Sequence, residues 1–139
     1  MKIDHDYLKK LLEAYQAAEG PTTDLKELQR NGIDLEDKKF EFHVVLLLDK
    51  GLIEGSGKSG GAGSVGLQRF VNGNMTVSLG VQSRLTATGH EFIEALEQPD
   101  IWQTITTGFK NTSLETMLSV SRDLLSAILK KKLLQLTGE

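Results

Sequence analysis

The 139-residue chain has no cysteine, only two prolines and few aromatic residues, which make up 6% of it. Without cysteine it can form neither a disulfide framework nor a thiolate zinc site, and it has no cysteine nucleophile. Its longest strictly apolar run covers residues 44–48, far short of the roughly 18 residues that a membrane span needs. Its polar N-terminus lacks the apolar segment of a signal peptide. We therefore expect a cytoplasmic protein that spans no membrane.

Positive charge is also scarce. The chain has 16 lysines and arginines against 19 aspartates and glutamates, a net charge of −3, which is unlike the strongly basic composition of many nucleic-acid-binding proteins. The balance is uneven along the chain, because residues 55–85 contain three basic and no acidic side chains. Lys58, Arg69 and Arg84 could therefore contact phosphate, or they could belong to a lightly charged loop.

Hydrophobic residues make up 39% of the chain and charged residues 25%, as in globular domains, so we expect a folded protein. The N-terminal part of the chain is predicted to be helical. Apolar residues at three- and four-residue steps predict a first helix from Asp4 or Asp6 to about Ala18. A short second helix carries Leu25 and Leu28.

A third helix is expected from Leu35 to about Lys50, with Asp34 as its N-cap and Gly51 as its stop. Its apolar residues lie on one stripe, which we expect to belong to the core of the domain. This stripe consists of Phe40, Val44, Leu47 and Leu48, and it is widened by Val45 and Leu46.

Glycine is concentrated in residues 55–66, which hold six of the 14 glycines. Because ordering so many glycines costs much backbone entropy, we expect a mobile loop there. The step Asn72-Gly73 lies between two segments with β propensity, residues 67–71 and 75–79, and is a strong signal for a hairpin.

Three more helices are expected after the hairpin. Thr86 or Thr88 can cap the first of them, and a short helix around residues 101–105 ends at Gly108. A capping box at residues 112–115 opens a long C-terminal helix.

The predicted order of elements is that of a winged helix. We expect a mainly α protein with a β-hairpin, in the α+β class. A winged helix-turn-helix-like domain would cover residues 1–97, with its wing at about 55–85, and a C-terminal helical extension would cover residues 98–139.

Two stretches carry a resemblance to a known family. They are FHVVLLLDKGLI, at residues 42–53, and RLTATGHEFIEAL, at residues 84–96, which is followed by Ile101-Trp102. They resemble an uncharacterised family of small bacterial and prophage proteins, a domain of unknown function, over the region from about His43 to the C-terminal helix. The resemblance implies a winged-helix-like fold and a phage or bacterial gene set, and it carries over no catalytic residue.

Motifs for catalysis and cofactor binding are weak. Residues 55–60 match the letters of the dinucleotide fingerprint, but neither a preceding buried strand nor a following helix is predicted around them. His90 and Glu94 lie four residues apart on a predicted helix, yet two ligands do not make a metal site. No serine stands in a nucleophile elbow. We expect no enzyme, catalytic residue, cofactor or metal.

The third helix leads to two hypotheses. As the recognition helix of a DNA-binding regulator, it would bring Lys38 and Lys39 to duplex DNA, while Lys58, Arg69 and Arg84 approach from the wing. Its exposed carboxylates outnumber its ammonium groups, however, which favours a protein-binding adaptor or inhibitor with the same fold. Analogy of fold favours DNA slightly, and it is an association rather than a physical argument.

The long C-terminal helix predicts a homodimer. Its apolar residues repeat at alternating four- and three-residue steps, as in a coiled-coil seam. The alternative is that this face packs against the first helix and residues 101–105 of the same chain. The predicted interface consists of Leu114, Leu118, Ser121, Leu125 and Ile128.

Overall fold

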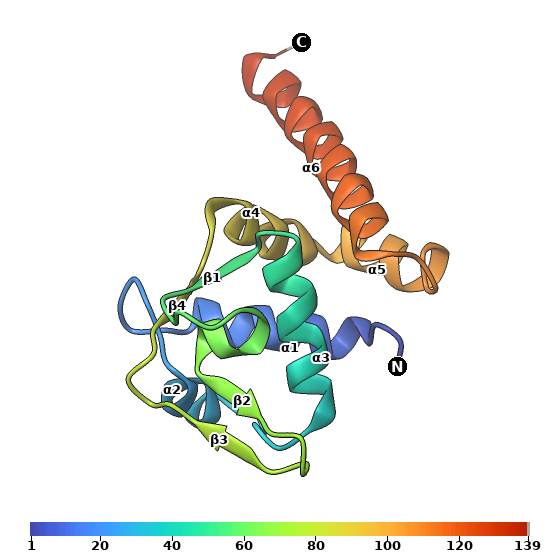
Figure 1. The fold of residues 1–139 in the computed structure, drawn as a ribbon. Coiled ribbons are helices and arrows are strands. Elements are labelled where there is room, and N and C mark those ends of the chain that lie inside the picture. The colour runs from blue at the N-terminus through green and yellow to red at the C-terminus, as the bar shows by residue number, and fades with distance from the viewer. Residues whose placement is uncertain (139) are drawn as a thin grey trace. The chain divides into compact units, whose positions relative to one another are not determined.

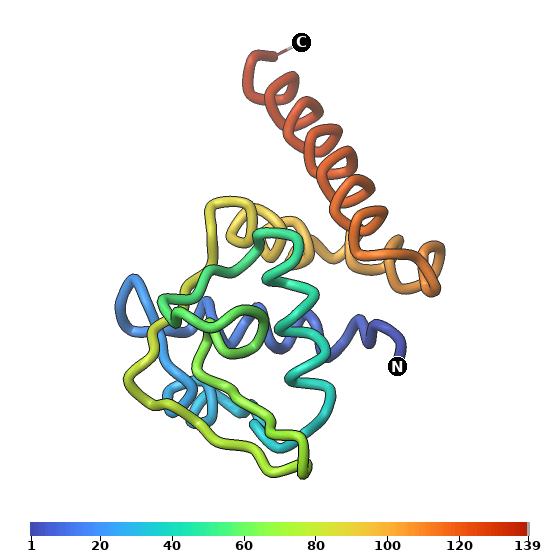
Figure 2. The backbone as a smooth tube through the Cα atoms, viewed as in Figure 1, coloured from blue at the N-terminus to red at the C-terminus, as the bar shows by residue number. Residues whose placement is uncertain are grey.

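The computed structural model describes residues 1–138, and its fold is α+β with a β-hairpin, as predicted (Figures 1 and 2). The elements in chain order are α1 (His5–Gln16), α2 (Leu25–Arg30), α3 (Lys38–Asp49), β1 (Ile53–Gly55), the 3-10 helix η1 (Gly61–Val65), β2 (Leu67–Arg69), β3 (Met75–Val77), β4 (Ser83–Leu85), α4 (Ala87–Leu96), α5 (Pro99–Gly108) and α6 (Leu114–Thr137).

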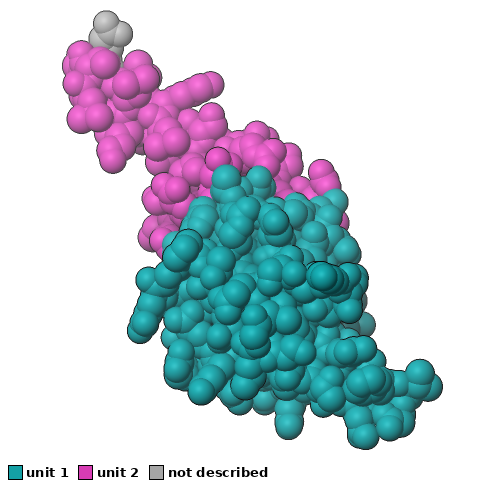
Figure 3. Space-filling model, turned by 60° about the vertical axis from the view of Figure 1, so that its left-hand side comes forward, with its two compact units in different colours: residues 1–90 teal, residues 91–139 magenta. Residues whose placement is uncertain are grey.

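The chain forms two compact units, which Figure 3 shows in different colours. The first unit is Met1–His90, and the second begins at Glu91, so the boundary lies within α4. The sequence pattern sets the end of the winged-helix-like domain at residue 97. Among the helices of residues 1–138, none combines the length and the apolar character that crossing a membrane requires.

Aspartate caps fix the first two helices where the apolar periodicity predicts them. The Asp4 carboxylate accepts a hydrogen bond from the Tyr7 N–H at 3.0 Å, and the Asp24 carboxylate accepts one from the Glu27 N–H at 2.8 Å. These bonds satisfy N–H groups that the first helical turn leaves without partners. Behind the caps, α1 packs against α3 and β4.

The third helix starts later than predicted. The Asp34 carboxylate accepts a hydrogen bond from the Glu36 N–H and closes only a turn, in which Leu35 is already buried. Asp37 is the N-cap of α3, with its carboxylate 2.9 Å from the Lys39 nitrogen. Asp34 and Asp37 are both suitable N-cap residues, and the local sequence pattern does not show which of them caps the helix.

The buried stripe of α3 largely matches the prediction. Phe40, Val44 and Leu47 are fully buried together with His43, whereas Leu48 is only half-buried. The predicted widening of the stripe by Val45 and Leu46 is wrong, because both are only half-buried and line the outward groove described below. The residues at 40, 43, 44 and 47 follow helical spacing, so they form one face.

A small sheet, which the sequence analysis did not predict, follows α3. Strand β1 pairs antiparallel with β4, with Ile53 opposite Leu85. Thr23, between α1 and α2, joins the other edge of β4, because the Thr23 and Ser83 backbones exchange two hydrogen bonds of 2.7 and 2.8 Å. The order across the sheet is therefore Thr23, β4, β1.

The glycine-rich segment has more structure than the mobile loop expected from its composition. It contains η1, which packs against α3, β1 and β2 and buries Val65. The Gly57 N–H donates to the Ser64 carbonyl at 2.9 Å. A Cβ atom at Gly55 would lie 2.0 Å from the Ser64 carbonyl oxygen, so glycine is needed there for a close backbone approach. The close backbone contacts of Gly55 and Gly57 with Ser64 offset the loss of backbone entropy on which the prediction of a mobile loop was based.

The predicted hairpin is present with shorter strands. Strands β2 and β3 pair from Leu67 opposite Val77 to Arg69 opposite Met75. The Gly73 N–H donates to the Phe70 carbonyl at 2.9 Å, and Gly73 has a φ of +86°. This is the three-residue type of hairpin loop, in which glycine takes the left-handed position after a turn.

The helices after the sheet lie where the sequence predicts them. The Thr86 hydroxyl accepts a hydrogen bond from the Gly89 N–H at 3.1 Å and so caps α4. Ser113, and not Thr112, caps α6, because its hydroxyl accepts the Thr116 N–H at 3.2 Å. Within the second unit, α5 packs against α6.

Candidate functional site

The outward side of α3 forms a groove together with the hairpin. Its residues on α3 follow helical spacing on the side opposite the buried stripe, and Arg69 of β2 closes one edge. The groove has a volume of about 540 Å³, and its centre is apolar. It is lined by Met1, Lys38, Glu41, Phe42, Val45, Leu46 and Arg69.

An ion pair joins the hairpin to α3 at the rim of this groove. The Arg69 Nε donates to the Glu41 carboxylate at 2.8 Å, and both side chains are about one-third exposed. The same guanidinium reaches the Gly73 carbonyl at 3.4 Å. Arg69 is thus held against α3 by a carboxylate rather than directed at solvent alone.

Two more of the predicted DNA contacts are paired in the same way. Lys39 Nζ lies 2.8 Å from the Asp4 carboxylate, and Arg84 lies 3.0 Å from the Glu54 carboxylate. The hydrogen bond from Lys39 lowers the pKa of Asp4, and the bond to Asp4 raises the pKa of Lys39. Both groups therefore stay charged at neutral pH, and each carboxylate offsets the attraction of its cation for phosphate.

The remaining two predicted contacts are free of such pairing. Lys38 and Lys58 are exposed and form no ion pair within residues 1–138. Lys38 and Arg69 both line the groove, whereas Lys58 lies in the glycine-rich segment and Arg84 on β4. Of the five predicted contacts, the structure brings only Lys38 and Arg69 to this groove.

His43 has a structural role that the sequence analysis missed. The Asp4 N–H donates to its Nε2 at 3.0 Å, and its Nδ1 lies 2.7 Å from the Lys39 carbonyl. The ring must therefore carry its proton on Nδ1 and be neutral, and burial lowers its pKa. It also stacks near Tyr7, with ring centroids 4.9 Å apart. Its position three residues after Phe40, on the buried face of the helix, could have indicated from the sequence that His43 is buried.

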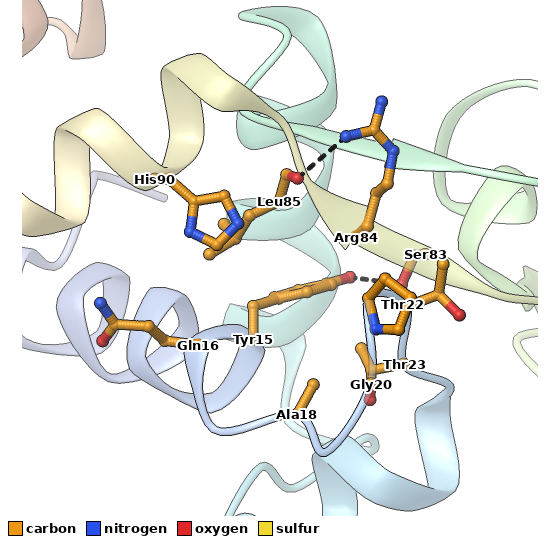
Figure 4. Close-up of a pocket in the computed structure, with 11 residues that line it drawn as sticks. Tyr15, Gln16, Ala18, Gly20, Thr22, Thr23, Ser83, Arg84, Leu85 and His90 are labelled. Atoms are coloured by element: carbon orange, nitrogen blue, oxygen red, sulfur yellow. Dashed lines mark hydrogen bonds between the residues drawn. The ribbon is translucent and has the colours of Figure 1, made fainter.

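A second, smaller pocket lies between the end of α1, β4 and the start of α4 (Figure 4). Its volume of about 130 Å³ is that of roughly four water molecules. The Tyr15 hydroxyl points at Ser83, with the two oxygens 2.9 Å apart, and burial raises the pKa of Tyr15 to about 12. Arg84 and His90 lie at its edge. Tyr15 is therefore a buried hydrogen-bonding group and remains protonated at neutral pH.

His90 and Glu94, which share a helix as predicted, gain no third ligand. Within the described chain, up to residue 138, no group of three or more histidine, aspartate or glutamate side chains is placed to hold a metal ion.

The predicted dimer residues of α6 fall into two groups. Leu114 and Ser121 are buried within the chain, whereas Leu118, Leu125 and Ile128 are half-buried. The most exposed apolar side chains of α6 lie beyond them, at Leu129, Leu133, Leu134 and Leu136.

Comparison with known proteins gives one match. Residues 2–115 match the model of a family described as "Hypothetical protein (DUF2513)". The match starts earlier than the resemblance seen in the sequence, since it includes α1 and α2, and it ends in the first turn of α6. No curated protein and no solved structure matches the chain.

Proposed function

We propose that this chain, which belongs to the uncharacterised DUF2513 family, is a non-enzymatic module that binds a protein partner in the α3 groove. The observation that carries the proposal is the apolar outward side of α3. Phe42, Val45 and Leu46 line the groove together with the basic side chains of Lys38 and Arg69, and the exposed lining is mostly apolar. A pocket that takes an apolar anchor side chain is a usual feature of protein–protein interfaces.

A winged-helix-like architecture supports this placement. In winged helices a core of three helices is followed by a β-hairpin wing, and the third helix is the usual recognition element. Here α1, α2 and α3 precede the β2–β3 hairpin, and residues 56–82, which include this hairpin, lie between the paired strands β1 and β4. On this alignment α3 is the recognition helix, so the groove lies where winged helices meet their targets.

The charges around the groove favour a protein over duplex DNA. A DNA-binding surface gains most of its affinity from cations that neutralise phosphates. Lys39 and Arg69 already face carboxylates, which leaves Lys38 as the unpaired cation on α3's groove side. A partner with an apolar anchor and a neighbouring acidic residue would match this surface.

Two variants test the proposal. Val45→Glu places a charge in the apolar centre of the groove, and Lys58→Glu is the matched control outside it. A photo-crosslinking residue in place of Phe42 should capture the same protein from the native host with the parent chain and with the control, and the Val45→Glu chain should capture none. Capture that is unchanged by Val45→Glu would remove the groove from the proposal.

Duplex DNA is the second candidate, supported by the winged-helix order and by the unpaired Lys38 and Lys58. Its test is the affinity for random-sequence duplex at about 50 and 200 mM salt, across which a phosphate-binding protein loses affinity steeply. Replacing Arg69 and Arg84 with alanine should then weaken binding uniformly and flatten the salt dependence. We expect no measurable affinity at either salt concentration, and a steep loss with salt would establish the DNA function instead.

We also propose that the protein forms a homodimer through α6. Of the predicted interface residues, Leu118, Leu125 and Ile128 remain partly accessible. We further propose that the protein lies in the cytoplasm, which its lack of cysteine supports, and that it belongs to a bacterial or prophage gene set, which the sequence resemblance supports.

A further inference from the structure

The two halves of α6 differ in what covers them. Leu114, Met117 and Ser121 in the first half are buried, and α5 packs against this helix within the second unit. From Arg122 to Thr137 no residue is buried, although seven of these residues are leucine or isoleucine. Because most of the stability of a helix in a protein comes from the packing of its apolar face, a packing partner would stabilise this half.

The exposed apolar residues of this half form one stripe. Leu125, Leu129, Leu133 and Leu136 follow steps of four, four and three residues, and the last three are 56%, 61% and 77% exposed. Arg122, Ser126 and Lys130 flank the stripe and line with it a shallow groove of about 360 Å³. The groove is almost entirely apolar along its floor, as a surface for a second helix would be.

Charge is distributed unevenly along α6. The part of α6 up to Asp123 carries Glu115, Arg122 and Asp123, and the part after Asp123 carries the three consecutive cations Lys130, Lys131 and Lys132. Two parallel copies of the helix would bring all six of these lysines together. Two antiparallel copies would set the two lysine clusters apart, and in the register proposed below each cluster lies level with Arg122 and Asp123 of the other copy.

We propose that the second half of α6 pairs with α6 of a second copy in an antiparallel arrangement, with Ser126 near the twofold axis. In this register Leu125 of one copy packs against Leu129 of the other, and Leu118 lies opposite Leu136. The inference rests on the proposed homodimer and adds its orientation, register and contacting half. It is independent of the partner that the α3 groove takes.

The oligomeric state is the first measurement. By light scattering at micromolar concentration the full chain should be a dimer, and Leu129→Glu should make it a monomer. Ala127→Glu is the matched control, because Ala127 is exposed on the opposite side of the helix, and it should leave the dimer intact. A monomeric parent chain would overturn both the homodimer and its orientation.

The orientation can be measured without interference, because the natural chain has no cysteine. Under mild oxidation Ser126→Cys should form a disulfide-linked dimer. Leu136→Cys alone should not, since the two positions would be about 27 Å apart along the axis at a rise of 1.5 Å per residue. An equimolar mixture of Leu118→Cys and Leu136→Cys should give the mixed dimer. A dimer in which Leu136→Cys links to itself would overturn the antiparallel arrangement alone.

Discussion

The outward face of α3 and the second half of α6 are both rich in apolar residues, but the two helices differ in how the rest of the protein supports them. α3 is fixed on its inner side by four buried residues and at its rim by the Arg69–Glu41 ion pair, so its apolar outer face is a shaped groove on a firm support. The second half of α6 has no buried residue and is a bare stripe. Leucine content alone therefore does not indicate a core, because burial depends on the elements that surround a helix.

The largest expected effect tests the inner support of α3. Leu47 is fully buried, so Leu47→Ala should lower the free energy of unfolding by about 2–5 kcal/mol, through lost burial and the cavity that remains. Leu134→Ala on α6 is the control, since this side chain is 51% exposed and lies away from the proposed stripe. It should change the unfolding free energy by about 0.5 kcal/mol or less in urea titrations. Equal effects would contradict the difference between the two helices.

A second test concerns η1, the neighbour that supports α3 from the glycine-rich segment. Gly55→Ala brings its Cβ against a backbone carbonyl that cannot rotate away, and it should cost about 1–3 kcal/mol of unfolding free energy. Gly60→Ala is the control, because its Cβ meets no atom within 4 Å and its φ of −72° suits alanine. We expect Gly60→Ala to be neutral or to stabilise by up to about 1 kcal/mol. If both substitutions are neutral in the same urea titrations, the segment does not hold α3.

The third test uses pH. Because the folded protein lowers the pKa of His43, protonation favours the unfolded chain. The contribution of His43 is complete above its ordinary pKa of about 6.5 and is lost as pH falls below that value, by up to about 1.4 kcal/mol per pH unit. Urea titrations between about pH 7.5 and 5 should show this loss in the parent chain and in His90→Gln, but not in His43→Gln. An equal or steeper loss of stability in the His43→Gln variant would contradict the lowered pKa of His43.

The sequence predicts some elements of this fold and not others. The helices were predictable, because apolar spacing and caps such as Asp24 and Thr86 are local signals. The sheet of Thr23, β4 and β1 was missed as a sheet, because strands of three residues are too short for an alternating pattern. η1 was missed because its support is a backbone approach between Gly55 and Ser64, which composition does not show.

The candidate site was only partly predictable, for a related reason. Basic residues could be assigned to the third helix and the wing, but their partners lie far away in sequence. Lys39 pairs with Asp4 across 35 residues, Arg69 with Glu41 across 28, and Arg84 with Glu54 across 30. Only the tertiary structure shows that these cations are already paired, and this fact moves the balance from DNA toward a protein partner.

The smallest expected effect concerns the ion pair at the rim of the groove. Since Arg69 and Glu41 are each about one-third exposed, a double-mutant cycle with Arg69→Ala and Glu41→Ala should give a coupling of about 0.2–1 kcal/mol, which shrinks at high salt. The single variant Glu41→Gln tests the effect of the ion pair on DNA binding, because it removes the carboxylate that pairs with Arg69 in the groove that Lys38 also lines. If pairing limits the attraction of this surface for phosphate, Glu41→Gln should bind duplex DNA more tightly than the parent chain does, in a weak and salt-dependent manner, and the double variant Glu41→Gln/Arg69→Ala should lose this gain again. A gain that persists in the double variant would mean that Arg69 is not the cation that the carboxylate restrains.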